Sequence, residues 1–521
     1  MNKTEYKQNN LTIKATASMF QVAPLTITNW VKEGLLEFDE NHRVTYQSVQ
    51  RFKARCAGKI KLKARANKKL KDVHDPEEVS RIIQLELVSA QFDEHIGDRY
   101  EAMLSESYRN KEGITYTPMN IIDDMLCDVP VDSTTTFLDP CCGTGNFLIK
   151  AIEKGVAPEN LYGFDTDLNA VLIARRRIVQ LTGRDAPNVV CADFLKECQQ
   201  MTTRFDLAFT NPPWGKKLSK EERTEYGKRW GTGISTDTSS LFLFEVMSIV
   251  KPEGIAGLLM PESFFNIAVY EDARKEVLKK NILKITDYGK PFNNMYSACA
   301  LTVRNAAFHE GNTVVCSNGS KEILRQQSSF FGMPKHILNY WTANHEMEII
   351  EQLMQQRYLT LKDHASWGLG IVTGNNTSIC KRTRQPGTKP IYRGKDIFPT
   401  KLNKAGLFIN PNDFSRCQQV SSMELFHAPE KLIYRFISNE LVFYYDTRQR
   451  YILNSANMLV LDKDFPLSAK QLAEVLNAPL TRWLFKQLFH THKVLRGDLE
   501  ALPLFPDLVL HCRLNLLDFN R

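Results

Sequence analysis

Asn211-Pro212-Pro213-Trp214 combines a side-chain amide, two rigid prolines and a large aromatic ring. These residues follow Phe205-Asp-Leu-Ala-Phe-Thr210, an apolar run that is typical of a buried strand. The prolines end the strand and hold φ near about −65°. The amide of Asn211 and the flat face of Trp214 therefore meet at its carboxyl end. These groups suit the binding of a planar ring that carries an exocyclic amine.

The run Asp139-Pro-Cys-Cys-Gly-Thr-Gly-Asn-Phe147 connects an earlier predicted strand to a predicted helix. Gly143 and Gly145 allow a sharp turn and a close approach of the backbone to a ligand. The run lacks the third glycine of a dinucleotide fingerprint and the lysine of a phosphate-binding loop. An acid at the end of the strand disfavours a pyrophosphate. It favours a cationic ligand, such as the ammonium and sulfonium of S-adenosylmethionine.

Two further acids end the next predicted strands. Asp165 lies 22 residues after Gly143 (165 − 143), where a carboxylate can accept both hydroxyls of a ribose. Asp193 could accept the amine of an adenine, with Phe194 against the face of the ring. Asp193 alone is equally typical of an acid that caps a turn. Its position beside two other strand-end acids favours the binding role.

The order of these motifs resembles the amino-methyltransferases of DNA, in particular the adenine-N6 enzymes of the γ class. That class places the cofactor motif first, the Asn-Pro-Pro-aromatic motif second and the target-recognition domain last. The likeness covers roughly residues 80–506. It implies S-adenosylmethionine as the cofactor, with residues 115–118 against its methionine part. The implied cofactor-binding residues are Thr115, Tyr116, Thr117, Pro118, Asp139, Pro140, Cys141, Gly143, Gly145, Asn146, Phe147, Asp165, Asp193 and Phe194.

The motif residues also predict how a methyl group is transferred. The Asn211 side-chain oxygen and the Pro212 carbonyl can each accept one N–H bond of the target amine, which localises its lone pair. The sulfonium is already an activated leaving group, so no metal is expected, and positioning supplies most of the rate. A base in a duplex must be flipped out to reach such a site. The predicted catalytic residues are Asn211, Pro212, Pro213 and Trp214.

Two aromatic residues are candidates to stack on the flipped base. Trp214 belongs to the motif itself. The resemblance implies that Phe292, in Lys290-Pro-Phe292, follows the sixth strand as the second one. Tyr296 is an alternative to Phe292, and for either residue an ordinary place in the core is about equally expected.

Candidate strands and helices alternate between about residues 113 and 307, which predicts a doubly wound α/β sheet of seven strands, a Rossmann-like methyltransferase fold. Such sheets bind ligands beyond the carboxyl ends of their strands. The predicted strands are Thr136–Asp139, Leu161–Asp165, Val189–Asp193, Phe205–Thr210, Gly254–Met260, Ile282–Tyr288 and Ala300–Val303. The predicted helices between them are 146–154, 168–182, 238–250 and 270–280.

We expect four regions along the chain. They are a small helical domain at 1–55, a basic linker at 56–75, a catalytic domain at 76–310 that begins with a long helix over 76–109, and a mixed α+β target-recognition domain at 311–521. In the first region, expected helices at 11–20, 25–34 and 46–52 and a wing strand at 43–46 resemble the winged helix-turn-helix of mercury-resistance-type regulators. The alternative is a packing unit without DNA contact.

The basic excess of the chain lies in its first 72 residues. They hold 15 Lys and Arg against 6 Asp and Glu, whereas the remainder holds 52 and 53. Residues 51–71 carry ten of these bases and no acid. A solvated linker of this kind adds salt-sensitive affinity for phosphates, so the basic excess indicates a polyanion partner. The resemblance implies that this partner is double-stranded DNA.

Basic residues elsewhere are further candidates for DNA contacts. Gly215–Thr236 is a polar insertion that could close over a flipped base or form a plain solvated loop. The region 360–506 carries many aromatics and scattered arginines, although each base alone is more typical of an ordinary surface charge. The candidates are Lys216, Lys217, Arg393, Lys395, Arg435 and Arg448.

The resemblance implies a site-specific DNA adenine-N6 methyltransferase, the modification activity of a restriction–modification system whose endonuclease would be encoded separately. A methyltransferase of RNA or of protein glutamine and a non-catalytic DNA-binding regulator are the alternatives. The 11 scattered cysteines, the polar start of the chain and the lack of a long apolar run predict a cytoplasmic protein without a membrane span.

Overall fold

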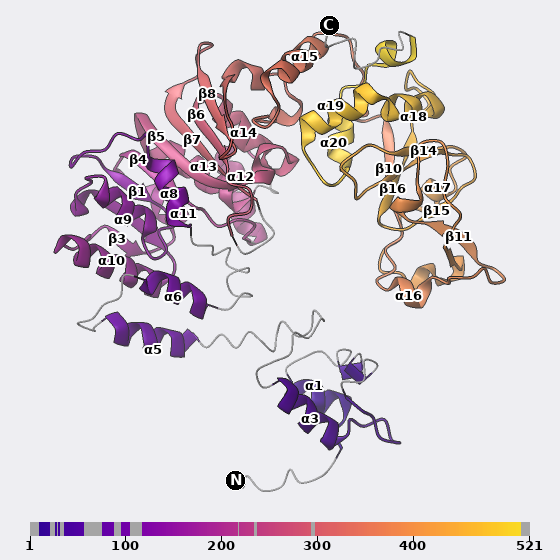
Figure 1. The fold of residues 1–521 in the computed structure, drawn as a ribbon, viewed down its shortest axis with the longest axis horizontal. Helices are drawn as coiled ribbons and strands as arrows, with labels where there is room; N and C mark the ends of the chain where they lie inside the picture. The colour runs from indigo at the N-terminus through magenta and orange to yellow at the C-terminus, as the bar shows by residue number, and fades with distance from the viewer. Residues whose placement is uncertain are drawn as a thin grey trace.

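The computed structural model contains a central sheet with helices on both faces and smaller N-terminal and C-terminal units (Figure 1). The described residues are 10–20, 27–28, 30–31, 36–56, 76–87, 95–104, 117–216, 218–233, 237–292 and 297–511. Within these ranges, no helix is long and apolar enough to cross a membrane.

The central sheet has nine strands in the order β3-β2-β1-β4-β5-β7-β6-β8-β9. β7 runs antiparallel to β5 and β6, and β9 runs antiparallel to β8, while the other neighbours are parallel. The strands are β1 (Phe137–Asp139), β2 (Leu161–Asp165), β3 (Val189–Cys191), β4 (Phe205–Thr210), β5 (Val250–Pro261), β6 (Lys280–Asp287), β7 (Ala298–Ala307), β8 (Thr313–Ser317) and β9 (Glu322–Gln326).

The doubly wound α/β fold is confirmed, but the sheet holds two strands more than the seven predicted. β8 pairs in parallel with β6, so the sheet continues beyond residue 310, where we expected the next domain to begin. Val314 and Cys316 are the buried residues of β8. Two apolar positions are too few for periodicity to assign a strand to one domain or the next.

Helices on both faces of the sheet enclose two apolar layers. Leu148 of α9 and Ile178 of α10 lie in one layer with Phe209 of β4. Leu243 of α13 and Val277 of α14 lie in the other. These helices are α8 (Met119–Leu126), α9 (Asn146–Glu153), α10 (Leu168–Thr182), α11 (Phe194–Glu197), α13 (Thr238–Ile249) and α14 (Glu271–Leu278).

The long helix predicted over residues 76–109 is wrong in its described part. The structure contains α5 (Pro76–Leu87) and α6 (Ile96–Met103), and α6 has its own N-cap at His95. Leu104 ends α6 because its ψ of 131° is extended. Ile83 and Tyr100 nevertheless pack against α10, so the apolar pattern located the buried face and missed the ends.

The polar insertion after Trp214 contains a helix, α12 (Lys220–Trp230), so the alternative of a plain solvated loop is wrong for that part. Ser219 and Glu222 cap its N-terminus reciprocally, and Gly231 ends it. Its C-terminal end is tied to α13 through Glu245, which is fully buried. Glu245 accepts a bond of 3.0 Å from Trp230 Nε1 and forms a 2.7 Å ion pair with Arg229.

The C-terminal region is of mixed α and β structure, as predicted. After α15 (Asn344–Met354) it contains a four-stranded sheet, a three-stranded sheet and a group of helices. The larger sheet has the order β10 (Ala365–Leu369), β16 (Ala456–Leu461), β13 (Lys431–Arg435) and β14 (Phe443–Asp446), and the smaller one β12 (Leu407–Ile409), β11 (Lys389–Tyr392) and β15 (Tyr451–Ile452). The helices are α16 (Asn376–Ile379), α17 (Met423–Phe426), α18 (Ala469–Asn477), α19 (Pro479–Phe489) and α20 (Arg496–Ala501).

The N-terminal unit has its own small core. α1 (Ile13–Met19) and α3 (Tyr46–Cys56) enclose Phe20, Trp30 and Phe52, whose rings contact one another at 4.6–5.7 Å. Val44 pairs with Leu11 where the wing strand was expected. Most of the predicted turn and second helix, and the linker from 57 to 75, lie outside the described residues.

Buried polar contacts join the region of the central sheet to the C-terminal helices. Asn266 and Asn339 donate to the backbone carbonyls of Phe489 and Gln487, at 2.8 and 3.0 Å. Lys335 forms an ion pair with Asp498 of α20, and both side chains are less than a tenth exposed. Buried hydrogen bonds and a buried ion pair therefore hold the two regions together, in addition to the chain that connects them.

Loss of the lysine from this pair should destabilise the protein. We expect Lys335→Met to cost about 3–5 kcal/mol because it leaves the Asp498 carboxylate buried and unpaired. Arg496→Gln breaks the exposed Arg496–Glu500 pair and should cost less than about 1 kcal/mol. Urea unfolding followed by tryptophan fluorescence measures both, and equal losses would contradict the prediction.

Candidate active site

A cavity of about 320 Å³ lies beyond the carboxyl ends of β1 to β4. This is the place where parallel α/β sheets bind ligands. The predicted site residues that line it are Thr117, Asp139, Pro140, Cys141, Gly143, Asn146, Phe147, Asp165, Asp193, Phe194, Asn211 and Pro213. The cofactor motif and the Asn-Pro-Pro-Trp motif thus open into one space.

Asp139 forms the acidic floor of this cavity at the end of β1. It is 1% exposed and accepts a bond of 3.1 Å from the backbone N–H of Cys141. Burial raises the pKa of Asp139 to about 7, with a further contribution from the nearby charge of Asp165. A buried carboxylate of this kind gains most when a cation enters the cavity.

Asp165, at the end of β2, is held by two backbone donors. Gly143 N–H donates to Oδ2 and Asp167 N–H donates to Oδ1, both at 2.9 Å. Burial raises the pKa of Asp165 to about 6. Gly143 has φ of 50°, so the turn that presents its N–H to Asp165 uses the left-handed region that glycine adopts without strain.

Gly145 does not line the cavity, and its side of the turn serves helix packing instead. Its φ is 89°, and a Cβ there would lie 2.9 Å from the Cβ of Ala174 on α10. The predicted close approach to a ligand therefore fits Gly143, whereas Gly145 lets α9 pack on α10.

The segment before α8 reaches the cavity through Thr117. Its carbonyl accepts a bond of 3.2 Å from Asn146 Nδ2. The Asn146 oxygen in turn accepts a bond of 2.8 Å from Arg177. Pro118 is the N-cap of α8 and does not line the cavity, and Thr115 and Tyr116 lie outside the described residues.

Asp193 and Phe194 stand at the N-terminus of α11. The Asp193 carboxylate accepts a bond of 3.2 Å from Leu195 N–H, so this acid caps the turn and also lines the cavity. Phe194 is almost fully buried and stacks on Phe242 of α13, with ring centroids 5.8 Å apart. This geometry is compatible with both roles considered for Asp193, which are to accept the amine of an adenine and to cap the turn.

Trp214 is fixed by the sheet rather than by the cavity. Its Nε1 donates to the carbonyl of Leu259 at 3.0 Å. Its ring meets Phe292 edge to face, with centroids 5.8 Å apart. Pro212 is buried, Asn211 and Pro213 face the cavity, and Tyr296 lies outside the described residues. The two candidate stacking residues are therefore neighbours at the carboxyl end of β4.

Sequence reasoning missed several residues of the cavity wall. Lys216, predicted as a DNA contact, lines the cavity, and Lys217 lies outside the described residues. Glu222 reaches the wall from α12, and its capping-box spacing after Ser219 was the signal that could have revealed that helix. The other missed residues are Cys142, Thr166, Asp167, Ala192, Leu195, Leu218, Thr238 and Phe242.

The DNA-contact candidates of the C-terminal region differ in their surroundings. Arg393 pairs with Asp396 at 3.1 Å, and Arg435 donates to the carbonyl of Ile397 at 2.9 Å. Lys395 and Arg448 are exposed. The Arg448 turn is shaped by a buried carboxylate, Asp446, which accepts bonds from the backbone of residues 448 and 450 and pairs with buried Lys431.

Two protein-family models match the chain. The N-6 DNA methylase model matches residues 91–287, and the TaqI-like C-terminal specificity domain model matches residues 389–504. The first range contains the cavity and Asn211. The second contains the whole three-stranded sheet and every strand of the four-stranded sheet except β10.

The chain is similar along most of its length to known enzymes of one kind. It is 39% identical over 390 residues to the type II methyltransferase M.VspI of Vibrio sp. (strain 343), covering 74% of this chain and 96% of the relative. It is 23% identical over 216 residues to the modification methylase CviBIII of Paramecium bursaria Chlorella virus NC1A, covering 40% and 53%.

Two solved structures share the fold. The DrdV–DNA complex aligns with a TM-score of 0.50 and 14% identity over 88% of this chain and 62% of that one. The DNA complex of the type IIL restriction-modification enzyme MmeI aligns with a TM-score of 0.50 and 9% identity over 95% and 88%.

Gly145→Ala should separate backbone strain from packing. The new Cβ meets Ala174 at 2.9 Å and φ is positive, so we expect a loss of about 1–3 kcal/mol in stability. Gly183→Ala is the matched control, since φ is 71° there but nothing lies within 4 Å. Thermal unfolding should show a larger loss of stability for Gly145→Ala than for Gly183→Ala. Equal losses would mean that the positive φ, and not the contact with Ala174, causes the whole loss.

Proposed function

The chain belongs to the type II DNA methyltransferases of restriction–modification systems, and we propose that it methylates N6 of a flipped-out adenine at one DNA sequence, with S-adenosylmethionine as methyl donor. The observation that carries this proposal is the shared cavity. Asn211 and Pro213 open into the same space as Asp139 and Asp165. A methyl donor and an amine acceptor can therefore meet there.

The acids of the cavity support a cationic cofactor. Asp139 is buried with one backbone donor, and Asp165 already accepts two backbone N–H bonds. A sulfonium and an ammonium would add positive charge beside these carboxylates, in the cavity that Lys216 also lines. S-adenosylmethionine, when bound, supplies a methyl group on an activated sulfur.

The chain's own contribution to the reaction is positioning and electrostatics. Asn211 and the Pro212 carbonyl are proposed to accept the two N–H bonds of the target amine, so that its lone pair points at the methyl group. The bond from Trp214 Nε1 to Leu259 holds the indole in place while a base enters. A ring can stack between Trp214 and Phe292 only after their edge contact opens.

We also propose roles for the C-terminal domain, for the N-terminal unit and for a partner endonuclease. The C-terminal domain reads the DNA sequence, with Arg448 presented by the Asp446 turn as a contact. The N-terminal unit is a winged helix-turn-helix that adds DNA affinity together with the basic linker. A separately encoded endonuclease would complete the restriction–modification pair.

Mapping of modified bases tests the proposal directly. DNA from cells that express the protein should carry N6-methyladenine at one sequence motif. Asn211→Ala should lower the methylation rate about 10²–10³-fold, as the loss of one transition-state hydrogen bond does elsewhere. Asn160→Ala, which removes only an exposed bond to Ser133, should leave the rate unchanged. A methyl mark found on RNA or protein, or an unchanged rate for Asn211→Ala, would overturn the proposal.

Cofactor affinity should rise with pH between about 5 and 8. Burial sets the pKa of Asp139 to about 7 and that of Asp165 to about 6, so both carboxyls are increasingly neutral below these values and attract a cation less. The dissociation constant of S-adenosylmethionine should fall by up to about tenfold per pH unit in this window.

Calorimetry in buffers of different ionisation enthalpy measures this effect as proton release on binding. Asp139→Asn should remove most of it. S-adenosylhomocysteine, which lacks the sulfonium charge, should release fewer protons. If neither ligand's binding depended on pH, the proposed attraction of the cofactor by the two acids would be contradicted.

A further inference from the structure

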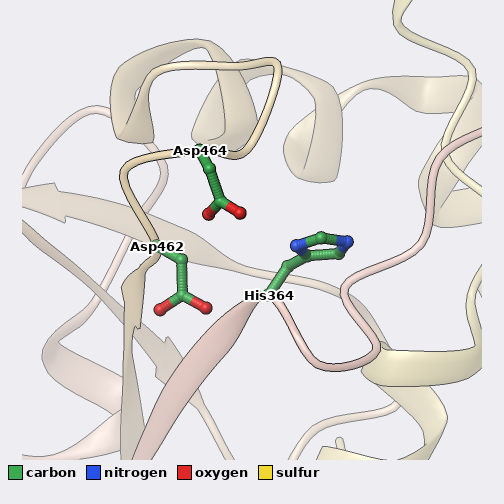
Figure 2. Close-up of side chains that lie close together, drawn as sticks. All are labelled: His364, Asp462 and Asp464. Atoms are coloured by element: carbon green, nitrogen blue, oxygen red, sulfur yellow. The ribbon is translucent and has the colours of Figure 1, made fainter.

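A second convergence of polar side chains lies in the C-terminal domain, away from the cavity (Figure 2). His364 precedes β10, and Asp462 and Asp464 follow β16, the antiparallel partner of β10. The pairing of Ala365 with Leu461 brings these residues to one corner of the sheet. One potential ligand atom from each side chain lies within 4.8 Å of the other two.

We propose that this corner, formed by His364, Asp462 and Asp464, binds one divalent cation of the first transition row. Figure 2 shows the Asp464 carboxylate on the side of the imidazole, with the Asp462 side chain beside them. Two carboxylates held this close repel each other unless a positive charge lies between them. Within residues 297–511, which the structure describes in full, neither aspartate forms an ion pair with a lysine or arginine.

The imidazole gives an independent indication. His364 Nδ1 is buried and has no hydrogen-bond partner among the described residues. A buried ring nitrogen without a partner is uncommon in folded proteins, and an ion is one of its ordinary explanations. The ring is also held in place, because it packs against Phe465 with centroids 5.4 Å apart.

The ligand set favours one class of cation. Calcium and magnesium take oxygen ligands, whereas one imidazole with two carboxylates suits zinc or manganese. Asp464 is exposed, so its carboxylate can move inward to the shorter spacing that a bound ion requires. The site would fasten the end of β16 to the start of β10 next to Asp363, which has a φ of 61°.

Metal binding by the full-length protein tests this inference. After removal of metals with a chelator, we expect one equivalent of Mn²⁺ or Zn²⁺ to bind, as measured by calorimetry and by the loss of the free Mn²⁺ signal in electron paramagnetic resonance. Binding should raise the melting temperature. Asp464→Asn should weaken the affinity at least about tenfold and remove the thermal shift. This exposed position carries little risk to folding.

Histidine controls distinguish the site from adventitious binding. His364→Gln should abolish the stoichiometric event, whereas His345→Gln, at an exposed position of α15, should leave it intact. Equal binding by wild type and Asp464→Asn, or an equal loss in His345→Gln, would overturn the inference. Cofactor binding and DNA methylation do not enter this test, so its outcome is separate from the proposed enzymatic function.

Discussion

The withdrawal of two carboxylates from water at the carboxyl ends of β1 and β2 is the constraint on which the cavity depends. Burial raises the pKa of both Asp139 and Asp165. The charge of Asp165 adds to the rise at Asp139, and the charge of Asp167 adds to the rise at Asp165. Burial without compensation would be prohibitive. The turn from Asp139 to Gly145 supplies backbone N–H groups. Lys216 lines the same cavity, and its charge lowers the pKa of Asp165 against the larger effect of burial. A positively charged cofactor would stabilise the two carboxylates further.

The wall of the cavity that α12 forms depends on a third buried acid, Glu245. Glu245 binds both Arg229 and Trp230 and so fixes the C-terminal end of α12 against α13. The other end of α12 carries Glu222 into the cavity wall. The chain that follows the Asn-Pro-Pro-Trp motif is therefore not a free loop. It contains a capped helix, and the N-terminal turn of this helix contributes to the cavity wall.

The sequence predicted the parts of the molecule in which local pattern and burial agree. Apolar runs ending in Asp139, Asp165 and Thr210 located β1, β2 and β4, and sheet topology then brought their ends together. The roles of Gly145 and Lys216 could not be predicted in this way. The packing of Gly145 on Ala174 depends on a helix crossing, and the position of Lys216 depends on where α12 returns. Neither the helix crossing nor the return of α12 produces a periodic pattern of residues in the sequence.

The orientation of the recognition domain follows from the same kind of long-range polar contact. Arg274 is fully buried and donates to the carbonyls of Phe264, Lys335 and His336, at 2.6–3.1 Å. Lys335 and His336 both have positive φ, a conformation that non-glycine residues adopt at a cost. The guanidinium holds this strained turn, and the turn carries the ammonium that meets Asp498. Since a buried ion pair adds little net stability compared with apolar packing, its value here is geometric. It ties the C-terminal helix α20 to the turn that Arg274 holds beside the central sheet.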